Sequence, residues 1–208
     1  MSDRAALVHR GLVLNWLTLA YNSLEAIVSI VAGVLAGSVA LIGFGADSVI
    51  ELTASGAAQW RLRADIDLER RARVERITLR MIGATFLALA AYVAYESIDS
   101  LWRREAPKPS WLGVAILTLS VIVMPLLARA KRRVARAMES RALEADARQT
   151  SICAYLSIIA LAGVVLNAVA GWWWADPIAA LGMVPIIAHE GREGIRGEPG
   201  CDDCRPGA

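Results

Sequence analysis

Two carboxylates, Asp47 and Glu51, lie four residues apart in the stretch FGADSVIELTASG, whose other residues are mostly apolar or small. On a helix this spacing places both side chains on the same face. A carboxylate pair of this kind can bind a divalent cation, and because the ligands must be deprotonated, binding would release protons. The pattern indicates cation/proton exchange chemistry. The alternative is a protonated pair that hydrogen-bonds to neighbouring helices and binds no ion.

A third acidic residue, Glu25, occurs in LAYNSLEAIVS, with Asn22 three residues earlier on the same predicted helix face. Glu25 precedes Leu35 by ten residues, and Asp47 follows Ser38 by nine. With a turn near residues 35–38 and a rise of about 1.5 Å per residue, both acids would lie roughly 14 Å from the same membrane surface. We therefore expect Glu25 beside the acidic pair, as an additional ligand or as a proton relay.

The stretch EADARQTSICAYLS contains Asp146, Gln149 and Cys153 with a spacing that keeps them along one helical stripe. A thiolate beside carboxylates is a suitable ligand set for zinc or a related divalent ion. Cys153 could equally be a small buried apolar residue. Asp146, two residues before Arg148, could serve as an additional ligand or a proton relay, or could form part of a charged helix entrance.

The composition shows which elements must position these residues. Of 208 residues, 56% are hydrophobic and the mean hydropathy is +0.46, which indicates an integral membrane protein. We predict an all-α fold, a transmembrane bundle of six helices, each long enough to cross about 30 Å of hydrocarbon. The predicted spans are 11–35, 38–60, 77–101, 111–130, 150–172 and 174–192. The second and sixth are the least apolar, so neighbouring helices must shield them.

The distribution of arginine predicts the orientation. The net charge is only +2, but basic residues gather after the second span, in 61–76, and after the fourth, in 129–148, with Lys131 among them. This clustering marks both segments as cytoplasmic topology anchors and gives no indication of nucleic-acid binding. Both termini are then cytoplasmic, and the chain is a multi-pass protein of the plasma (inner) membrane. Anionic lipid headgroups are secondary partners for these arginines.

The tail 193–208 contains a CxxC formed by Cys201 and Cys204. A structural disulfide is not expected on the cytoplasmic side. These thiols are weak metal candidates, because a closed soft-metal site normally needs four ligands and only His189 is near in sequence. A solvated tail without metal is the alternative.

Three stretches, AGSVALIGFGADSVIELTAS, ALEADARQTSICAYLSIIALAG and GWWWADPIAAL, together with the six-span layout, resemble the cation diffusion facilitator family. The resemblance implies a transport site made of an acidic pair on the second helix and a His/Asp pair on the fifth. Asp47 and Glu51 match the first pair, and Gln149 and Cys153 occupy the places of the second. The nitrogen ligand is thus replaced by a weak amide donor, and a sulfur is gained.

The resemblance implies efflux of a divalent cation from the cytoplasm, coupled to proton antiport by alternating access, with no permanently bound cofactor. Zinc is the expected ion, and cadmium, iron, cobalt and manganese are alternatives. The rival hypothesis is a non-transporting metal-binding membrane protein, a sensor or an assembly partner. An enzyme with Cys153 as nucleophile is disfavoured, because His9 and His189 lie near span ends and no histidine within a span could activate the thiol.

The family usually carries a soluble cytoplasmic domain after the sixth helix, and residues 193–208 are too few to form one. The resemblance is therefore to the membrane domain alone. A homodimer would have to form through transmembrane helices. The small residues Ala32, Ala36 and Ala40, and Gly33 and Gly37 on an adjacent face, are candidates for a close helix contact.

Overall fold

The structure, a computed structural model, describes the backbone of residues 2–63, 68–137 and 141–196, and the side chains of 9–53, 80–137 and 146–196. These residues form an all-α fold, which confirms the predicted fold class. The helices are α1 (Ser2–Ala36), α2 (Val39–Arg63), α3 (Leu68–Arg103), α4 (Trp111–Ala137), α5 (Arg141–Ala170) and α6 (Ala175–Arg196). Each of them overlaps one predicted span.

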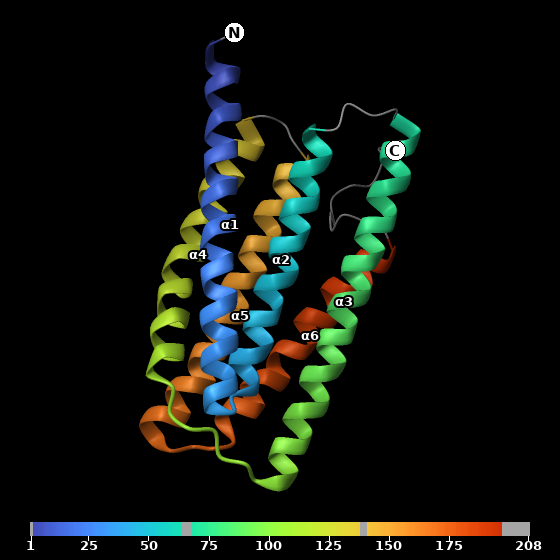
Figure 1. Cartoon of the computed structure of the whole chain (residues 1–208). Helices are drawn as coiled ribbons and strands as arrows, with labels where there is room; N and C mark the ends of the chain where they lie inside the picture. Colours follow the sequence, from blue (N-terminus) through green and yellow to red (C-terminus); the bar gives the residue numbers. More distant parts are fainter. Residues whose placement is uncertain (1, 64–67, 138–140, 197–208) are drawn as a thin grey trace, which may run out of the picture.

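The six helices form a compact group of four and a pair (Figure 1). In the group, α1 packs on α2 and α4, and α5 packs on α4 and α2. The pair is made by α3 and α6, which contact each other extensively and reach the group through α2 and α5. Successive helices run in opposite directions, so the start of α1 and the end of α6 point to the same side (Figure 1). Which side is cytoplasmic remains a prediction.

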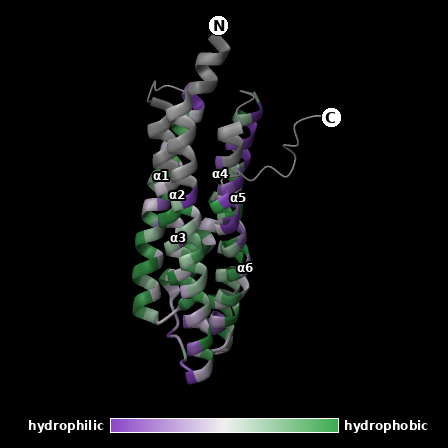
Figure 2. Cartoon of the chain, turned by 90° about the vertical axis from the view of Figure 1, so that its right-hand side faces the viewer, coloured by the Kyte–Doolittle hydropathy of each residue, from purple (hydrophilic) through white to green (hydrophobic). Residues whose placement is uncertain are grey.

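The surface of the bundle is apolar along most of its length. Within the described residues, four stretches are long and apolar enough to cross a membrane: His9–Ala36, Arg80–Arg103, Trp111–Ala137 and Asp146–Ala170. Large apolar side chains point outward from them, for example Val34, Ile98 and Ile122. Hydrophilic residues gather toward the upper ends of α4 and α5 (Figure 2). The chain is therefore an integral membrane protein, in which α2 and α6 are the helices that need shielding.

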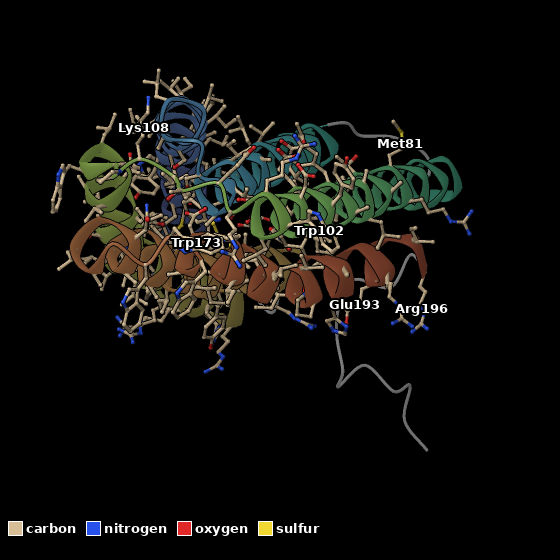
Figure 3. All side chains as sticks on the ribbon, turned by 90° about the horizontal axis from the view of Figure 1, so that it is seen from below. Met81, Trp102, Lys108, Trp173, Glu193 and Arg196 are labelled. Atoms are coloured by element: carbon tan, nitrogen blue, oxygen red, sulfur yellow. The ribbon has the colours of Figure 1, made fainter. Side chains whose placement is uncertain are left out.

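Polar contacts hold the lower end of the bundle together, where three links meet. Ser38, between α1 and α2, donates its hydroxyl to Asp176 Oδ1 of α6 over 2.5 Å. In the α3–α4 link, the Lys108 amide donates to the Ala36 carbonyl over 2.8 Å, and the Pro107 carbonyl accepts from Asn167 Nδ2 over 3.0 Å. Figure 3 shows the lower end, with Lys108 and Trp173 labelled. We call these contacts the lower clasp.

Two glycines allow α1 and α2 to approach closely. A Cβ at Gly45 would lie 2.7 Å from Ile30 Cγ1 and 3.0 Å from the Ile30 backbone nitrogen, and one at Gly33 would lie 2.9 Å from the Ile42 nitrogen. This contact places Glu25 of α1 beside the α2 residues that follow Gly45.

The same packing corrects the expectation for the small residues at the end of α1 and the start of α2. Ala32, Ala36 and Ala40 are buried inside the chain, at 3%, 8% and 0% exposure. These positions are therefore occupied by the chain's own packing, and they do not form a free surface for a second copy. A homodimer would have to use other helix faces.

The α1–α2 contact generates a first prediction. Gly45→Ala should destabilise the protein by about 1–3 kcal/mol, because the added methyl overlaps backbone and side-chain atoms of Ile30. Thermal unfolding of the purified protein in detergent measures the effect. The matched control is Gly182→Ala in α6, where a Cβ would meet only Ile159 Cγ2, at 3.7 Å. Equal melting temperatures for the two variants would contradict the close contact.

Candidate metal centre

Three buried acidic side chains meet inside the group of four helices. Glu25 of α1 and the pair Asp47 and Glu51 of α2 are all at most 1% exposed. Ser48 donates its hydroxyl to Glu25 Oε2 over 2.9 Å, which places Glu25 at the depth of the pair. The carboxyl groups are close enough for Asp47 to interact electrostatically with both glutamates. The structure thus brings together the three acids that the sequence predicted to share one level.

Helix α5 brings a thiol to this cluster. Cys153 is 1% exposed, and its Sγ lies 3.9 Å from Glu25 Oε2. The same thiol interacts with Asp47 and Glu51. From residue counting, Cys153 would lie deeper than Asp47 unless the fifth helix tilted or continued beyond the membrane. The contact of Cys153 with Glu25 places the thiol at the level of the acids, so counting residues from Trp172 placed Cys153 wrongly.

Several oxygens of the cluster are buried and accept no hydrogen bond. They are both carboxylate oxygens of Asp47, Glu51 Oε2 and Glu25 Oε1. The side-chain amide of Asn22, one turn before Glu25, is likewise buried and without a hydrogen-bond partner. Buried polar atoms are nearly always satisfied in folded proteins, and each exception needs an explanation. A cation or water in the cluster would supply one here.

Among the described side chains, no group of three or more His, Cys, Asp and Glu residues has its ligand atoms close enough to hold a metal ion. The distance of 3.9 Å between the Cys153 sulfur and Glu25 Oε2 is one example of this wide spacing between ligand atoms. Binding an ion would therefore require small side-chain movements that draw the acids and the thiol together.

On the fifth helix, the structure places a residue that the sequence analysis missed next to the acids. Gln149, the predicted amide ligand, is only partly buried. Thr150 is fully buried and donates its hydroxyl to Glu51 Oε1 over 3.2 Å. The spacing in the sequence could have predicted this position for Thr150, because residues 146, 150 and 153 also lie along one stripe of a helix. The ligand role of Gln149 remains a prediction.

Asp146, predicted as an additional ligand or a proton relay, forms an ion pair, and both roles remain predictions. Its Oδ2 lies 2.8 Å from the Lys131 ammonium. Lys131 was interpreted as a cytoplasmic topology anchor, but α4 continues to Ala137 and buries this lysine at 3% exposure. The physical reason is the counter-ion, because a buried ammonium is tolerated only when paired. Asp146 and Lys131 interact electrostatically with Glu51, so the pair adjoins the cluster.

The remaining predicted ligands, Cys201 and Cys204, lie outside the described residues, and so do the arginine side chains of 61–76. The structure therefore does not test the CxxC or these topology anchors.

Comparison with known proteins connects this cluster to a family. The profile of the cation efflux transmembrane domain matches residues 16–196, which include most of α1 and all of α2 to α6 within the described residues. The chain is 27% identical over 169 residues to magnetosome protein MamB of Magnetospirillum gryphiswaldense, covering 78% of this chain and 57% of that protein. It is 25% identical over 155 residues to an uncharacterized transporter of Synechocystis sp., covering 72% of this chain and 50% of that protein.

A second MamB, from Paramagnetospirillum magneticum, is also 27% identical over 169 residues. The chain thus spans about half the length of the curated relatives it matches. The match of the family profile covers far more than half of the chain itself. The chain therefore belongs to the cation efflux family, whose transmembrane domain it carries from residue 16 to residue 196.

Proposed function

We propose that this protein transports a divalent metal cation out of the cytoplasm through the cluster of Glu25, Asp47, Glu51 and Cys153. The observation that carries the proposal is the convergence of these four groups, from three helices, at one buried level. Carboxylates in a membrane interior are costly and tend to mark ion pathways. Membership of a family of cation transporters supports the same reading.

The ligand types favour zinc or cadmium. A thiolate is a soft ligand, and with carboxylates it forms a set that suits zinc and softer divalent ions better than manganese. Asp47 and Glu51 match the family's acidic pair, and Cys153 supplies the fifth-helix ligand. Gln149 would join only if its side chain turned inward.

Proton antiport follows from the charges. The cluster contains three carboxyl groups and a thiol, whereas the ion carries two positive charges. Metal binding requires deprotonated ligands, so the ion and protons compete for the same groups. Protons arriving from the outer side would displace the ion there, and the ion would displace protons on the cytoplasmic side. Alternating exposure of the cluster to the two sides then couples the two fluxes.

Uptake into vesicles tests the transport site. Asp47→Asn should abolish zinc uptake driven by a pH gradient, and Cys153→Ser should strongly reduce it, because each variant removes a charged ligand. A fluorescent zinc indicator inside reconstituted vesicles measures the flux. The control is Asp99→Asn, since Asp99 is a carboxylate paired with Arg103 on the surface of α3. Wild-type uptake in both site variants would refute the site, and zinc binding without flux would favour the non-transporting rival.

Proton release provides a second test, which addresses coupling. Adding zinc to the purified protein in weak buffer should release about one to two protons per bound ion, because the ligands lose protons when they coordinate. A pH indicator dye records the release. Asp47→Asn should release fewer protons, and Asp99→Asn should behave as the wild type. Zinc binding with no proton release would exclude antiport through these groups.

The thiol generates a prediction about selectivity. Cys153→Asp replaces the soft ligand with a hard one and should shift the preference from cadmium and zinc toward manganese. Competition among these ions for binding to the purified protein gives the order of affinities. Cys153→Ser serves as the control, because it removes the thiolate without adding a carboxylate. An unchanged order in Cys153→Asp would show that Cys153 is not a ligand.

A further inference from the structure

A buried lysine adjoins the acidic cluster, and neither the transport chemistry nor the topology uses it. Lys131 projects from α4 toward α5, where its ammonium lies 2.8 Å from Asp146 Oδ2 and donates to Thr150 Oγ1 over 3.1 Å. Removing an ammonium from water costs several kcal/mol before its interactions compensate, so a purely apolar contact would join the two helices at lower cost. The position of Lys131 therefore needs an explanation.

The hydroxyl of Thr150 connects this lysine to Glu51. An ammonium has three donors and no acceptor, so Thr150 Oγ1 must accept from Lys131. The single hydroxyl hydrogen is then directed to one of two acceptors, Glu51 Oε1 at 3.2 Å or the Asp146 carbonyl oxygen at 3.1 Å. The first choice forms a continuous chain of hydrogen bonds from Lys131 through Thr150 to Glu51.

When the Thr150 hydrogen is directed to Glu51, one end of the Glu51 carboxylate is held and the other is left unoccupied. Oε1 accepts from Thr150, whereas Oε2 is buried and has no hydrogen-bond partner. Outer groups that bind a ligand's second atom commonly fix its orientation toward a metal. We propose that Lys131 and Thr150 are positioning residues that aim Glu51 Oε2 at the transported cation. The inference rests on the proposed function, since it assumes that Glu51 is a ligand.

A neighbouring contact shows that a polar contact between α4 and α5 does not require a buried charge. Arg132, the next residue, donates to Ser151 on α5 over 2.9 Å, and Arg132 is exposed. The two contacts join the same helices one residue apart, but only the buried one continues to an acid of the cluster. The Arg132–Ser151 contact therefore provides a matched control.

The test is zinc affinity, measured by titrating the purified full chain in lipid nanodiscs. Thr150→Val removes the hydroxyl and keeps the size of the side chain, and it should weaken zinc binding about tenfold, the lower range for lost outer-shell partners of a metal ligand. Thr150→Ser should restore the affinity to near the wild-type value. Ser151→Ala should leave it unchanged. Wild-type affinity in Thr150→Val, or equal losses in Thr150→Val and Ser151→Ala, would overturn the proposal.

Lys131→Met tests the other end of the hydrogen-bond series from Lys131 through Thr150 to Glu51. Its loss of affinity should match that of Thr150→Val, and the double variant should lose no more than either single one, because the two residues act through one hydrogen bond. Additive losses would show that Lys131 does not act through Thr150. If Lys131→Met fails to fold, the positioning role is tested by comparing the zinc affinities of Thr150→Val, Thr150→Ser and Ser151→Ala.

Asp47→Asn separates this inference from the function on which it rests. If Asp47→Asn still binds zinc as the wild type does, the proposed site fails, and the positioning role fails with it. If Asp47→Asn loses zinc while Thr150→Val keeps it, only the positioning role is wrong.

Discussion

Three carboxyl groups buried away from water are the constraint on which the rest of this structure depends. A bilayer offers no solvent to such groups, so the protein must provide polar neighbours or a cation. The neighbours come from helices distant in sequence: Ser48 beside Glu25, Thr150 beside Glu51, and the thiol of Cys153 near both. Because they are too few to satisfy every oxygen, the cluster keeps free acceptors at its centre. These free acceptors are the groups to which the proposed function assigns the ion.

Bringing these groups together depends on how closely the backbones approach. The α1–α2 contact works because Gly33 and Gly45 have no side chains, and a methyl at either would meet backbone nitrogen within 3.0 Å. The tight link at Gly37 and Ser38 then fixes the register of the two helices, with Gly37 in the left-handed conformation at φ 68°. Residues remote from the chemistry therefore determine whether Glu25 and Ser48 face each other.

The sequence predicted the features that depend on length and counting. Long apolar runs predicted six helices, and equal distances from a shared turn predicted that Glu25 would join Asp47. It did not identify Thr150, because two helical stripes were equally consistent with the spacing. Gln149 and Thr150 are adjacent, and only packing against α2 decides which one is buried. The burial of Lys131 was not predicted for a related reason. A lysine among arginines suggests a solvent-facing charge, and only the structure shows that Asp146 is its counter-ion.

The two ends of the bundle are closed by different means, and this bears on which end opens more easily. At the lower end the clasp joins α2 to α6 through Ser38 and Asp176, and two further bonds through the α3–α4 link join it to α1 and α5. Within the cluster, Glu51 contacts α5 through the hydroxyl of Thr150 and the thiol of Cys153. Among the described side chains, fewer hydrogen bonds join α2 to α5 at this level than join the links at the lower end. If the upper end is cytoplasmic, as the arginine distribution predicts, this asymmetry favours loading from inside. Release to the other side then requires the clasp to open, and an ion or proton can drive that change only by binding the two states with different affinities.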